Sequence, residues 1–529
     1  MDIDCISYQK SGYFSKLIVE YLDENPALQS LYHRSPKLEN FLLQLEEKQK
    51  NFPFEKREVL VNSLQKQYST TKTSEFTKSN IQLLKSDKTF TITTGHQLNL
   101  FSGPLYFLYK IITTINLCKE LKANYPNYNF VPIYWMATED HDFEEINHFV
   151  FKGKKISWNK ETFGPVGRLS TNGLKDVFEI FEKELGIGKN ADYLKNLFQK
   201  TYLEHDNLTN ATRFFANELF QNEGLVILDG DDVNLKKIFA PYVERELTEQ
   251  VSFQKVNETA KLLASYNIQV NPREINLFYT QDNLRERIVF ENNFYFVNNT
   301  ELRFTKDEIL EELENHPERF SPNVILRPLY QEVILPNLCY IGGGGEIAYW
   351  LELKSNFEAN AVLFPILLVR NSVLLTTKKQ IEKAQKLNLS MADLFQKRDE
   401  LLNNKTKEIS NFDIDFSAQK EFLKQQFENL YSIAEQTDIS FKNAVKAQEI
   451  KQIKGLDNLE KRLLKAEKRK LAEKLRRMKQ IQDELFPNQG LQERKNNFSE
   501  FYLEFGNELI IKLFKELDPL KNQFSIITL

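Results

Sequence analysis

Lys88-Thr-Phe-Thr-Ile-Thr-Thr-Gly-His-Gln97 begins the alternation of strands and helices from which the fold class of this chain follows. The β-branched and aromatic residues up to Ile92 indicate a strand. Hydrophobic residues at helical spacing follow over 104–123, and the apolar run 129–137 indicates a second, buried strand. A strand, a helix and a strand in this order favour a parallel sheet with a right-handed crossover, so the sequence predicts an α/β fold.

The composition limits the class of protein. The chain has 529 residues, enough for about two to four domains, and 41% of them are hydrophobic. Its net charge of −4 gives no general basic field for nucleic acid, and its 3 cysteines are too few and too scattered for a disulfide framework. Apolar runs stay shorter than the ~18 residues of a membrane span, and the opening MDIDCISYQK lacks a signal-peptide core. We therefore expect a soluble cytoplasmic protein without nucleic-acid or membrane partners.

Residues 1–377 are predicted to form the core that contains the sheet. Hydrophobic periodicity over 1–85 indicates helices before the first strand. Two further apolar runs predict buried strands at 224–230 and 362–370, and the first of these is followed by Asp231 and Asp232. Two insertions are predicted within this core: a mostly helical one at about 150–222 and a β-rich one at about 270–320.

The chain changes character at about Lys378, where it becomes rich in Lys, Glu, Leu and Gln. We predict a helical coiled-coil domain over 378–486 and a return to the core over 487–529 that ends in a short strand. Leu464, Leu471, Met478 and Leu485 recur every seven residues, which is coiled-coil spacing. The basic run 461–474 is interrupted by glutamates and is predicted to be a solvated helix face. Three long helices are expected, at 378–408, 416–451 and 456–485.

The end of the first predicted strand has the pattern of a nucleotidyl-transfer site. Gly95 lets the backbone approach a phosphate, and the helix that follows offers unpaired N–H groups to an anion. His96 can stabilise the charge that develops on an α-phosphate. The alternative is a glycine turn that happens to carry a polar histidine.

The second predicted strand is followed by Glu139-Asp140-His141-Asp142. Ligands bind at the carboxyl ends of strands in open α/β sheets, and adjacent carboxylates repel one another unless a cation or hydrogen bonds offset them. His141 can accept a proton from a nucleophile, or bind a metal together with Asp142 or His148. The alternative is the N-terminus of a helix that Asp142 caps. The identity of any metal stays open.

A third candidate is the loop of four glycines at 342–345, followed by Glu346 and Tyr349. Its N–H groups can hold a phosphate or a carboxylate, although it lacks the Lys-Ser/Thr ending of a P-loop. Flexibility alone is the alternative explanation. Arg327 and Arg370 follow or end apolar segments, and either can hold a carboxylate bidentately or form a structural ion pair.

Together these segments resemble the BshC family, cysteine ligases of bacillithiol biosynthesis. The resemblance rests on 94–106 with Lys110, on 135–148, on 322–332 and on 342–350, and it covers nearly the whole chain. Residues of the shared motifs are expected to bind substrate or nucleotide: Thr94, Gly95, Gln97, Asn99, Gly103, Tyr106, Lys110, Glu139, Asn147, Arg327, Gly343, Gly344, Glu346 and Tyr349, with Arg370 and Asn371 after a later strand. The catalytic candidates are His96, Asp140, His141 and Asp142.

The resemblance implies a Rossmann-like core related to class I aminoacyl-tRNA synthetases, with connective insertions and a coiled-coil domain that forms a homodimer. It implies that cysteine is added to the amine of glucosaminyl malate, giving bacillithiol. ATP is the expected cosubstrate, because a carboxylate does not acylate an amine in water without activation. Two other hypotheses remain: a coiled-coil scaffold that binds a nucleotide or anion, and a nucleotidyltransferase acting on another substrate.

Overall fold

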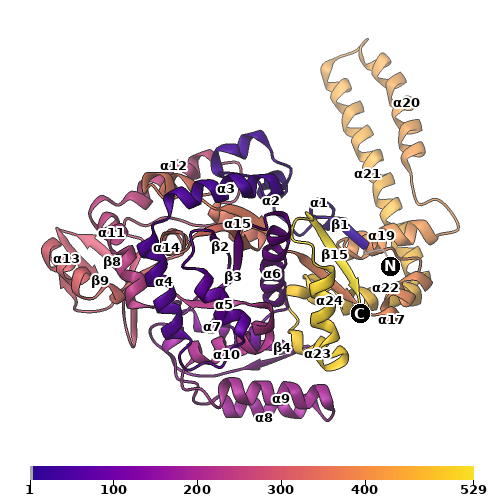
Figure 1. The fold of residues 1–529 in the computed structure, drawn as a ribbon. Coiled ribbons are helices and arrows are strands. Elements are labelled where there is room, and N and C mark those ends of the chain that lie inside the picture. The colour runs from indigo at the N-terminus through magenta and orange to yellow at the C-terminus, as the bar shows by residue number, and fades with distance from the viewer. Residues whose placement is uncertain (1–3) are drawn as a thin grey trace.

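A five-stranded parallel sheet organises the described part of the chain, residues 4–529 of a computed structural model (Figure 1). The strands lie in the order β13-β12-β2-β3-β6, and every neighbouring pair is parallel. If these five strands are numbered in chain order and read from the β6 edge, their order is 3-2-1-4-5, as in doubly wound Rossmann folds. The predicted α/β core is confirmed. Its strands are β2 (Thr89–His96), β3 (Asn129–Met136), β6 (Val226–Asp229), β12 (Asn337–Gly342) and β13 (Ile366–Val369).

Helix α6 (Tyr106–Asn124) makes the crossover between β2 and β3. Both strands are buried along nearly their whole length, as expected where helices cover both faces of a parallel sheet. In their register Gly95 lies opposite Trp135, and His96 lies opposite Met136. The strand order reverses between β2 and β12, so the carboxyl ends of these two strands border the crevice where such folds bind ligands.

Helices precede the first core strand, as the periodicity of 1–85 predicted. Serine side chains cap three of them: Ser7 accepts a hydrogen bond from the N–H of Lys10, Ser15 accepts one from Ile18, and Ser74 accepts one from Thr77. Residues 1–3 lie outside the described residues. They begin the opening segment in which the sequence shows no signal-peptide core. The elements are β1 (Asp4–Ser7), α1 (Tyr8–Ser11), α2 (Lys16–Leu22), η1 (Pro26–Leu31), α3 (Leu38–Asn51), α4 (Phe54–Gln67) and α5 (Glu75–Leu83).

A hairpin and several helices connect β3 to β6, at the bottom of Figure 1. Their core meets the start of α6 at Phe101, which has a φ of 48° and packs against Phe149, Phe181 and Phe198. The elements are α7 (Phe143–Ile146), β4 (His148–Phe151), β5 (Lys154–Ser157), η3 (Val166–Arg168), α8 (Leu174–Leu185), α9 (Lys189–Tyr202), α10 (Leu208–Phe220) and η4 (Gln221–Glu223); η2 (Leu100–Ser102) lies before α6.

An antiparallel sheet in the order β10-β9-β8-β7-β11 lies between β6 and β12 in the sequence. Its strands are β7 (Leu277–Gln281), β8 (Leu284–Glu291), β9 (Phe294–Val297), β10 (Arg303–Phe304) and β11 (Phe320–Pro322). The helices around it and after it are α11 (Val233–Glu249), α12 (Val251–Leu262), α13 (Lys306–Asn315), η5 (Pro317–Arg319), α14 (Arg327–Ile334), α15 (Gly344–Trp350) and α16 (Lys354–Ala359).

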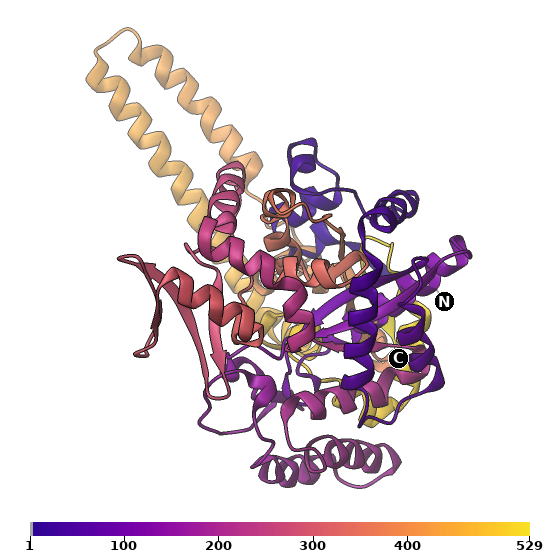
Figure 2. The ribbon, with the colours of Figure 1, turned by 60° about the vertical axis from the view of Figure 1, so that its left-hand side comes forward.

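The prediction of three long helices over 378–485 is wrong in its bounds. Asp438 caps a new helix by accepting the N–H of Phe441, which breaks the expected helix 416–451 into two. These two helices form a hairpin that projects from the body (Figures 1 and 2). The observed helices are α17 (Lys378–Lys386), α18 (Met391–Leu394), α19 (Arg398–Ile409), α20 (Ser417–Ala434), α21 (Ile439–Lys470) and α22 (Ala472–Leu485).

The seven-residue repeat divides between two environments. Met478 and Leu485 are fully buried, because α22 packs against α17, α19 and β14 (Ser372–Thr376) of the same chain. Leu471 lies at the junction of α21 and α22 and packs against the main core, while Leu464 is half-buried in the hairpin. Three of the four residues of the repeat therefore pack within one chain.

The C-terminal segment returns to the body, as its apolar end predicted. Strand β15 (Gln523–Thr528) pairs in parallel with β14 and antiparallel with β1, so both ends of the described chain share one sheet. The side chain of Asn497 donates to the backbone oxygens of Phe101 and Gly103. The remaining elements are η6 (Pro487–Gln489), η7 (Gln492–Arg494), α23 (Phe498–Phe505) and α24 (Glu508–Glu516). Among the helices of residues 4–529, none is long and apolar enough to cross a membrane.

Candidate active site

A cleft of about 940 Å³ opens at the carboxyl ends of β2, β3 and β12. Gly95, Glu139 and Gly343, which lie at or just after the ends of these strands, line one side of it. The opposite side comes from the antiparallel sheet, with Phe278 and Arg285 among the lining residues. The cleft therefore occupies the reversal point of the strand order, where the fold class binds its ligands.

The acidic loop, residues 139–142, enters this cleft directly after β3. The Oδ1 atom of Asp140 accepts the backbone N–H of His141 at 2.7 Å and that of Asp142 at 3.4 Å. Its Oδ2 atom accepts a hydrogen bond from Gln97 Nε2 at 2.9 Å. Asp142 precedes α7, but its side chain makes no capping bond within residues 4–529. The expected helix N-terminus is present, with Asp142 at the N-cap position of α7, but the hypothesis that its side chain caps the helix is wrong.

His141 contacts the opposite wall of the cleft. Its Nδ1 atom lies 2.5 Å from Nη1 of Arg285, and its ring packs against Phe278. A guanidinium carries only donors, so Nδ1 accepts and the proton of the neutral ring sits on Nε2. In this arrangement His141 offers the cleft a hydrogen-bond donor.

Lys110 ties the end of β2 to the start of α15. Its Nζ donates to the backbone oxygen of Gly95 at 2.7 Å and pairs with Glu346 at 2.6 Å. Glu346 in turn accepts the N–H of Gly343 at 2.8 Å and the hydroxyl of Tyr340 at 3.1 Å. Burial alone would raise the pKa of Glu346, but Lys110 and these hydrogen bonds hold it below its usual value. The N–H of Gly343 in the glycine loop is therefore already bonded to the carboxylate of Glu346.

His96 presents a neutral polar group to the cleft. Burial lowers its pKa to about 3, with the charge of Lys110 acting in the same direction, so the ring is uncharged at neutral pH. Its ring stands edge-on to Tyr106, with 5.4 Å between the centroids. Its Nε2 atom is buried and has no hydrogen-bond partner among the described residues. A ligand or an ordered water in the cleft can supply one.

Arg327 lies in a cage of aromatic rings formed by Trp135, Tyr340 and Trp350, with its guanidinium carbon 5.6–5.9 Å from their centroids. Nη1 donates to Gln331 at 3.0 Å. Within the part of the chain that the structure describes, the buried Nη2 has no partner. Tyr349 lies beside the same guanidinium. This arginine can hold an anion in the cleft.

Arg370 is already paired. Its Nη1 and Nη2 atoms donate to the two carboxylate oxygens of Glu493 at 3.1 and 2.8 Å, and both side chains are buried. A bidentate bond to a substrate carboxylate is therefore excluded while this pair holds. The Nε atom of Arg370 lies next to Gly343, at 3.8 Å from where a Cβ on that residue would be. It has no hydrogen-bond partner in residues 4–529. One N–H of Arg370 remains for a ligand.

Six predicted residues support the cleft through bonds or turns behind its lining. Thr94 donates to the backbone oxygen of Ile341 at 2.8 Å, and Asn371 accepts a hydrogen bond from Thr113 at 2.9 Å. Gly103 has a φ of 61°, which favours glycine at that turn. The six residues are Thr94, Asn99, Gly103, Asn147, Gly344 and Asn371.

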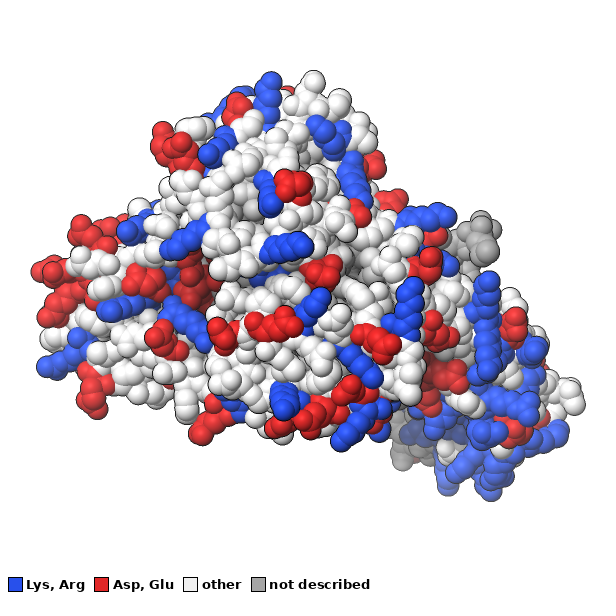
Figure 3. Space-filling model, turned by 60° about the horizontal axis from the view of Figure 1, so that its bottom comes forward, with Lys and Arg blue, Asp and Glu red and all other residues white. Residues whose placement is uncertain are grey.

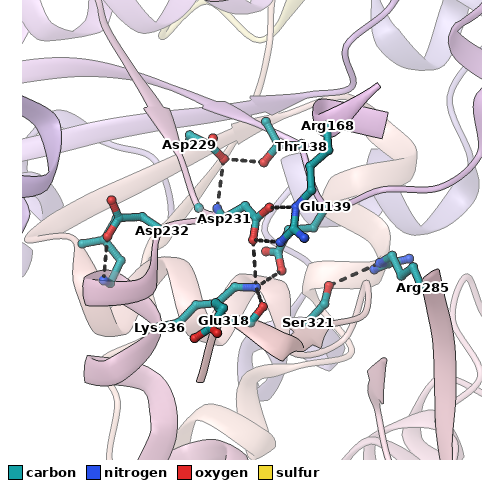
Figure 4. Close-up of polar contacts among 12 residues, drawn as sticks. Thr138, Glu139, Arg168, Asp229, Asp231, Asp232, Lys236, Arg285, Glu318 and Ser321 are labelled. Atoms are coloured by element: carbon teal, nitrogen blue, oxygen red, sulfur yellow. Dashed lines mark hydrogen bonds and ion pairs between the residues drawn. The ribbon is translucent and has the colours of Figure 1, made fainter. Parts of the chain in front are cut away.

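A buried ionic network beneath the cleft joins β3 to β6 (Figure 4). Arg168 donates two bonds to Asp231, at 2.8 and 3.0 Å, and Lys236 pairs with Asp231 at 3.2 Å and with Glu139 at 2.7 Å. Burial raises the pKa of Asp229 to about 6, and its carboxylate accepts the hydroxyl of Thr138. Glu139 is thereby fixed by the protein itself.

Sequence reasoning missed four arginines that line the cleft. Arg273, Arg285 and Arg287 belong to the far wall, and Arg494 comes from η7. Arg285 and Arg287 stand two residues apart on one strand and so face the same side of the sheet. That spacing was the available signal, but the sequence did not show that the β-rich segment folds back over the acidic loop.

Metal binding by the acidic loop gains no support from the geometry. Within residues 4–529 no group of three or more His, Cys, Asp or Glu is placed to hold a metal ion. His148 lies apart from the loop, where its Nδ1 atom contacts the side chain of Asn147 at 3.0 Å.

On the face drawn in Figure 3 the two signs of charge are mixed, with Lys and Arg denser at one end.

Comparisons with known proteins cover the entire chain. The Rossmann-like N-terminal domain of bacillithiol biosynthesis BshC matches residues 1–371, and the C-terminal coiled-coil domain of the same family matches residues 373–529. A protein of Flavobacterium johnsoniae named "Putative cysteine ligase BshC" is 64% identical over 529 residues, with 100% of both chains covered. Relatives of the same name are 63% identical in Flavobacterium psychrophilum and 58% identical in Christiangramia forsetii, each covering 100% of this chain and 99% of its own.

A solved structure from Campylobacter jejuni, titled "Crystal structure of putative arginyl t-RNA synthetase", covers 83% of this chain and 94% of its own at 13% identity. Its TM-score of 0.19 carries no argument, so the relation to class I synthetases stays a prediction. The names of the curated relatives confirm the predicted enzyme class, a ligase. Because both family domains match and the relatives align over the full length, the chain belongs to the BshC family of bacillithiol biosynthesis.

Proposed function

We propose that this protein joins the carboxyl group of L-cysteine to the amine of glucosaminyl malate, giving bacillithiol, with ATP as the activating cosubstrate. The observation that carries the proposal is the cleft at the reversal point of the sheet. It brings buried donors without protein partners and an acidic loop to the same space, and an amide-forming reaction between an anion and an amine needs both.

Activation is a chemical requirement of the reaction. A carboxylate oxygen of cysteine attacks the α-phosphorus of ATP, and the bond to the β-phosphate breaks to release pyrophosphate. The acceptor amine then attacks the carbonyl carbon, the bond to AMP breaks, and the amine nitrogen loses a proton. Donors that face the acyl phosphate stabilise the negative charge in both steps.

Three residues are suited to the anionic part of this chemistry. Arg327 Nη2, Arg370 Nε and His96 Nε2 are buried polar atoms without partners among the described residues, and all three side chains line the cleft. The neutral state of His96 allows it to approach a phosphate or carboxylate through one ring nitrogen without adding a charge. We assign them to the cysteine carboxylate and the α-phosphate.

The acidic loop is suited to the amines. Asp140 and Asp142 line the cleft, and a carboxylate beside an ammonium group stabilises it before it reacts.

We also propose that the protein acts in the cytoplasm and as a homodimer through the helical hairpin. The exposed apolar side chains of that hairpin, among them Phe422, Ile439 and Leu459, support the dimer.

The experiment combines the purified protein with L-cysteine, glucosaminyl malate and ATP, and detects bacillithiol by mass spectrometry. We expect product only in the complete mixture, with AMP and pyrophosphate formed in equal amounts. ADP and phosphate instead would support an acyl-phosphate route and reject adenylation. Binding of nucleotide without any product, under varied metal and pH conditions, would favour the scaffold hypothesis. Turnover of ATP with a different acceptor would favour a nucleotidyltransferase.

A further inference from the structure

The wall opposite the acidic loop carries a group of arginines on one strand face. Arg285 and Arg287 of β8 lie opposite Thr280 and Phe278 of β7, and Arg273 approaches from the preceding loop. Two residues along a strand span about 7 Å, so the two β8 arginines are close enough to contact two groups of one small ligand. Both are half-buried and line the cleft, so their charges face the same space.

The arginine wall, Arg273, Arg285 and Arg287, forms no ion pair with another described residue. Other arginines form ion pairs, as Arg168 does with Asp231 and Arg319 does with Glu312. Among the ion pairs of residues 4–529, none includes a member of the arginine wall. Burial lowers the pKa of Arg285, although the carboxylates of the acidic loop act in the opposite direction.

The arginine wall and the acidic loop face each other across the cleft. Arg285 contacts His141 at 2.5 Å, and Asp140 and Asp142 lie beside that histidine in the loop. A purely anionic ligand would be repelled by the loop, and a simple amine would be repelled by the wall. The arrangement matches a molecule that carries negative charges at one end and an amine at the other.

We infer that Arg273, Arg285 and Arg287 form a subsite for a short dicarboxylate, with the amine of the same molecule turned toward Asp140 and Asp142. Guanidinium groups bind carboxylates in a bidentate and charge-assisted way, and several of them distinguish a dianion from a monoanion. The assignment of this dicarboxylate to the malate end of the acceptor rests on the proposed function. The triphosphate of ATP is the other source of clustered negative charge.

Binding measurements on the full-length protein separate these sources. Wild type, Arg287→Met and Arg273→Met are titrated with L-malate, with L-lactate and with a non-hydrolysable ATP analogue by calorimetry and ligand-observed NMR. Arg303→Met is the matched control, because Arg303 is an exposed arginine of strand β10 in the same sheet. We expect wild type to prefer malate to lactate. Each wall variant should weaken malate binding by at least ~10-fold and leave the analogue unaffected.

Two results would overturn the inference: equal malate affinity in wild type and both wall variants, or loss of the ATP analogue with malate unchanged. Absence of malate binding to wild type at tens of millimolar would also count against it. Kinetics separate this inference from the proposed function. If product forms and Arg287→Met keeps the acceptor KM, the subsite is wrong and the reaction stands. If malate binds at the wall but no product ever forms, the subsite stands and the reaction is wrong.

Discussion

Arg285 donates a hydrogen bond from Nη1 to the Nδ1 atom of His141 across 2.5 Å. The contact joins the inserted antiparallel sheet to the loop that follows β3 of the core. Because a guanidinium has only donors, it fixes the ring with its proton on Nε2. His141 then acts toward a ligand as a hydrogen-bond donor, and acting as a base requires Arg285 to withdraw.

His141→Ala should lower bacillithiol formation by at least ~10²-fold, the scale expected when a positioned catalytic group is removed. His141→Gln should recover most of this loss, because the glutamine amide can place a donor near the position of Nε2. Initial rates at saturating substrates, with melting temperatures recorded on the same samples, make the comparison. A glutamine variant as inactive as the alanine variant would identify His141 as the proton acceptor instead.

Asp140→Asn should also reduce product formation by about 10²-fold while the fold is retained. The asparagine oxygen can still accept the N–H groups of the loop, so the loop should hold its shape while the negative charge is lost. Asp307→Asn, an exposed carboxylate in the first turn of α13, is the control. A variant whose free energy of unfolding falls by ~1 kcal/mol yet remains active would mean that Asp140 only shapes the loop.

His96 should make the protein less stable in acid. Its pKa is about 3 in the folded protein and near 6.5 when the chain is unfolded, so the unfolded state binds a proton first. The part of the unfolding free energy that depends on neutral His96 is fully present above pH 6.5 and is lost as the pH falls toward 3. Urea unfolding of wild type and His96→Gln across this range should show a steeper decline for wild type. Parallel declines would show that His96 is not buried in this way.

The buried pair of Arg370 and Glu493 should be important for stability. Glu493→Gln leaves a buried guanidinium without its countercharge, which typically costs about 3–5 kcal/mol of unfolding free energy. Glu473→Gln, which removes an exposed partner of Arg476 on α22, should leave the unfolding curve unchanged. Equal curves for both variants would mean that the C-terminal segment does not anchor Arg370 in solution.

The helical hairpin should determine the oligomeric state. Ile450 and Leu459 of α21 are 45% and 52% exposed, so replacing both by Glu should give monomers without disturbing the fold. Leu471 packs against the main core, so its replacement would test folding as well as assembly. Light scattering coupled to size-exclusion chromatography measures the mass. A native protein that is already monomeric would contradict the prediction.

The sequence was sufficient where local pattern determines structure. Strands β2 and β3 and helix α6 could be predicted because apolar runs and helical spacing reflect burial within a few residues. The positions of the acidic and glycine loops at strand ends followed from the same elements. The seven-residue repeat correctly indicated the coiled-coil domain that the family match confirms, but it did not show what the repeat packs against. The same spacing results when a helix packs on its own domain, as α22 does at Met478 and Leu485.

Which distant residues meet in the cleft depends on tertiary packing. Arg370 pairs with Glu493 across 123 positions of sequence, and Arg285 reaches His141 across 144. Composition and spacing showed charged side chains at the carboxyl ends of strands, but not which charges cancel and which remain for a ligand. That depends on the order in which the strands assemble and on the path by which the insertion folds back. Both are set by packing of the whole core, to which each local segment contributes only a part.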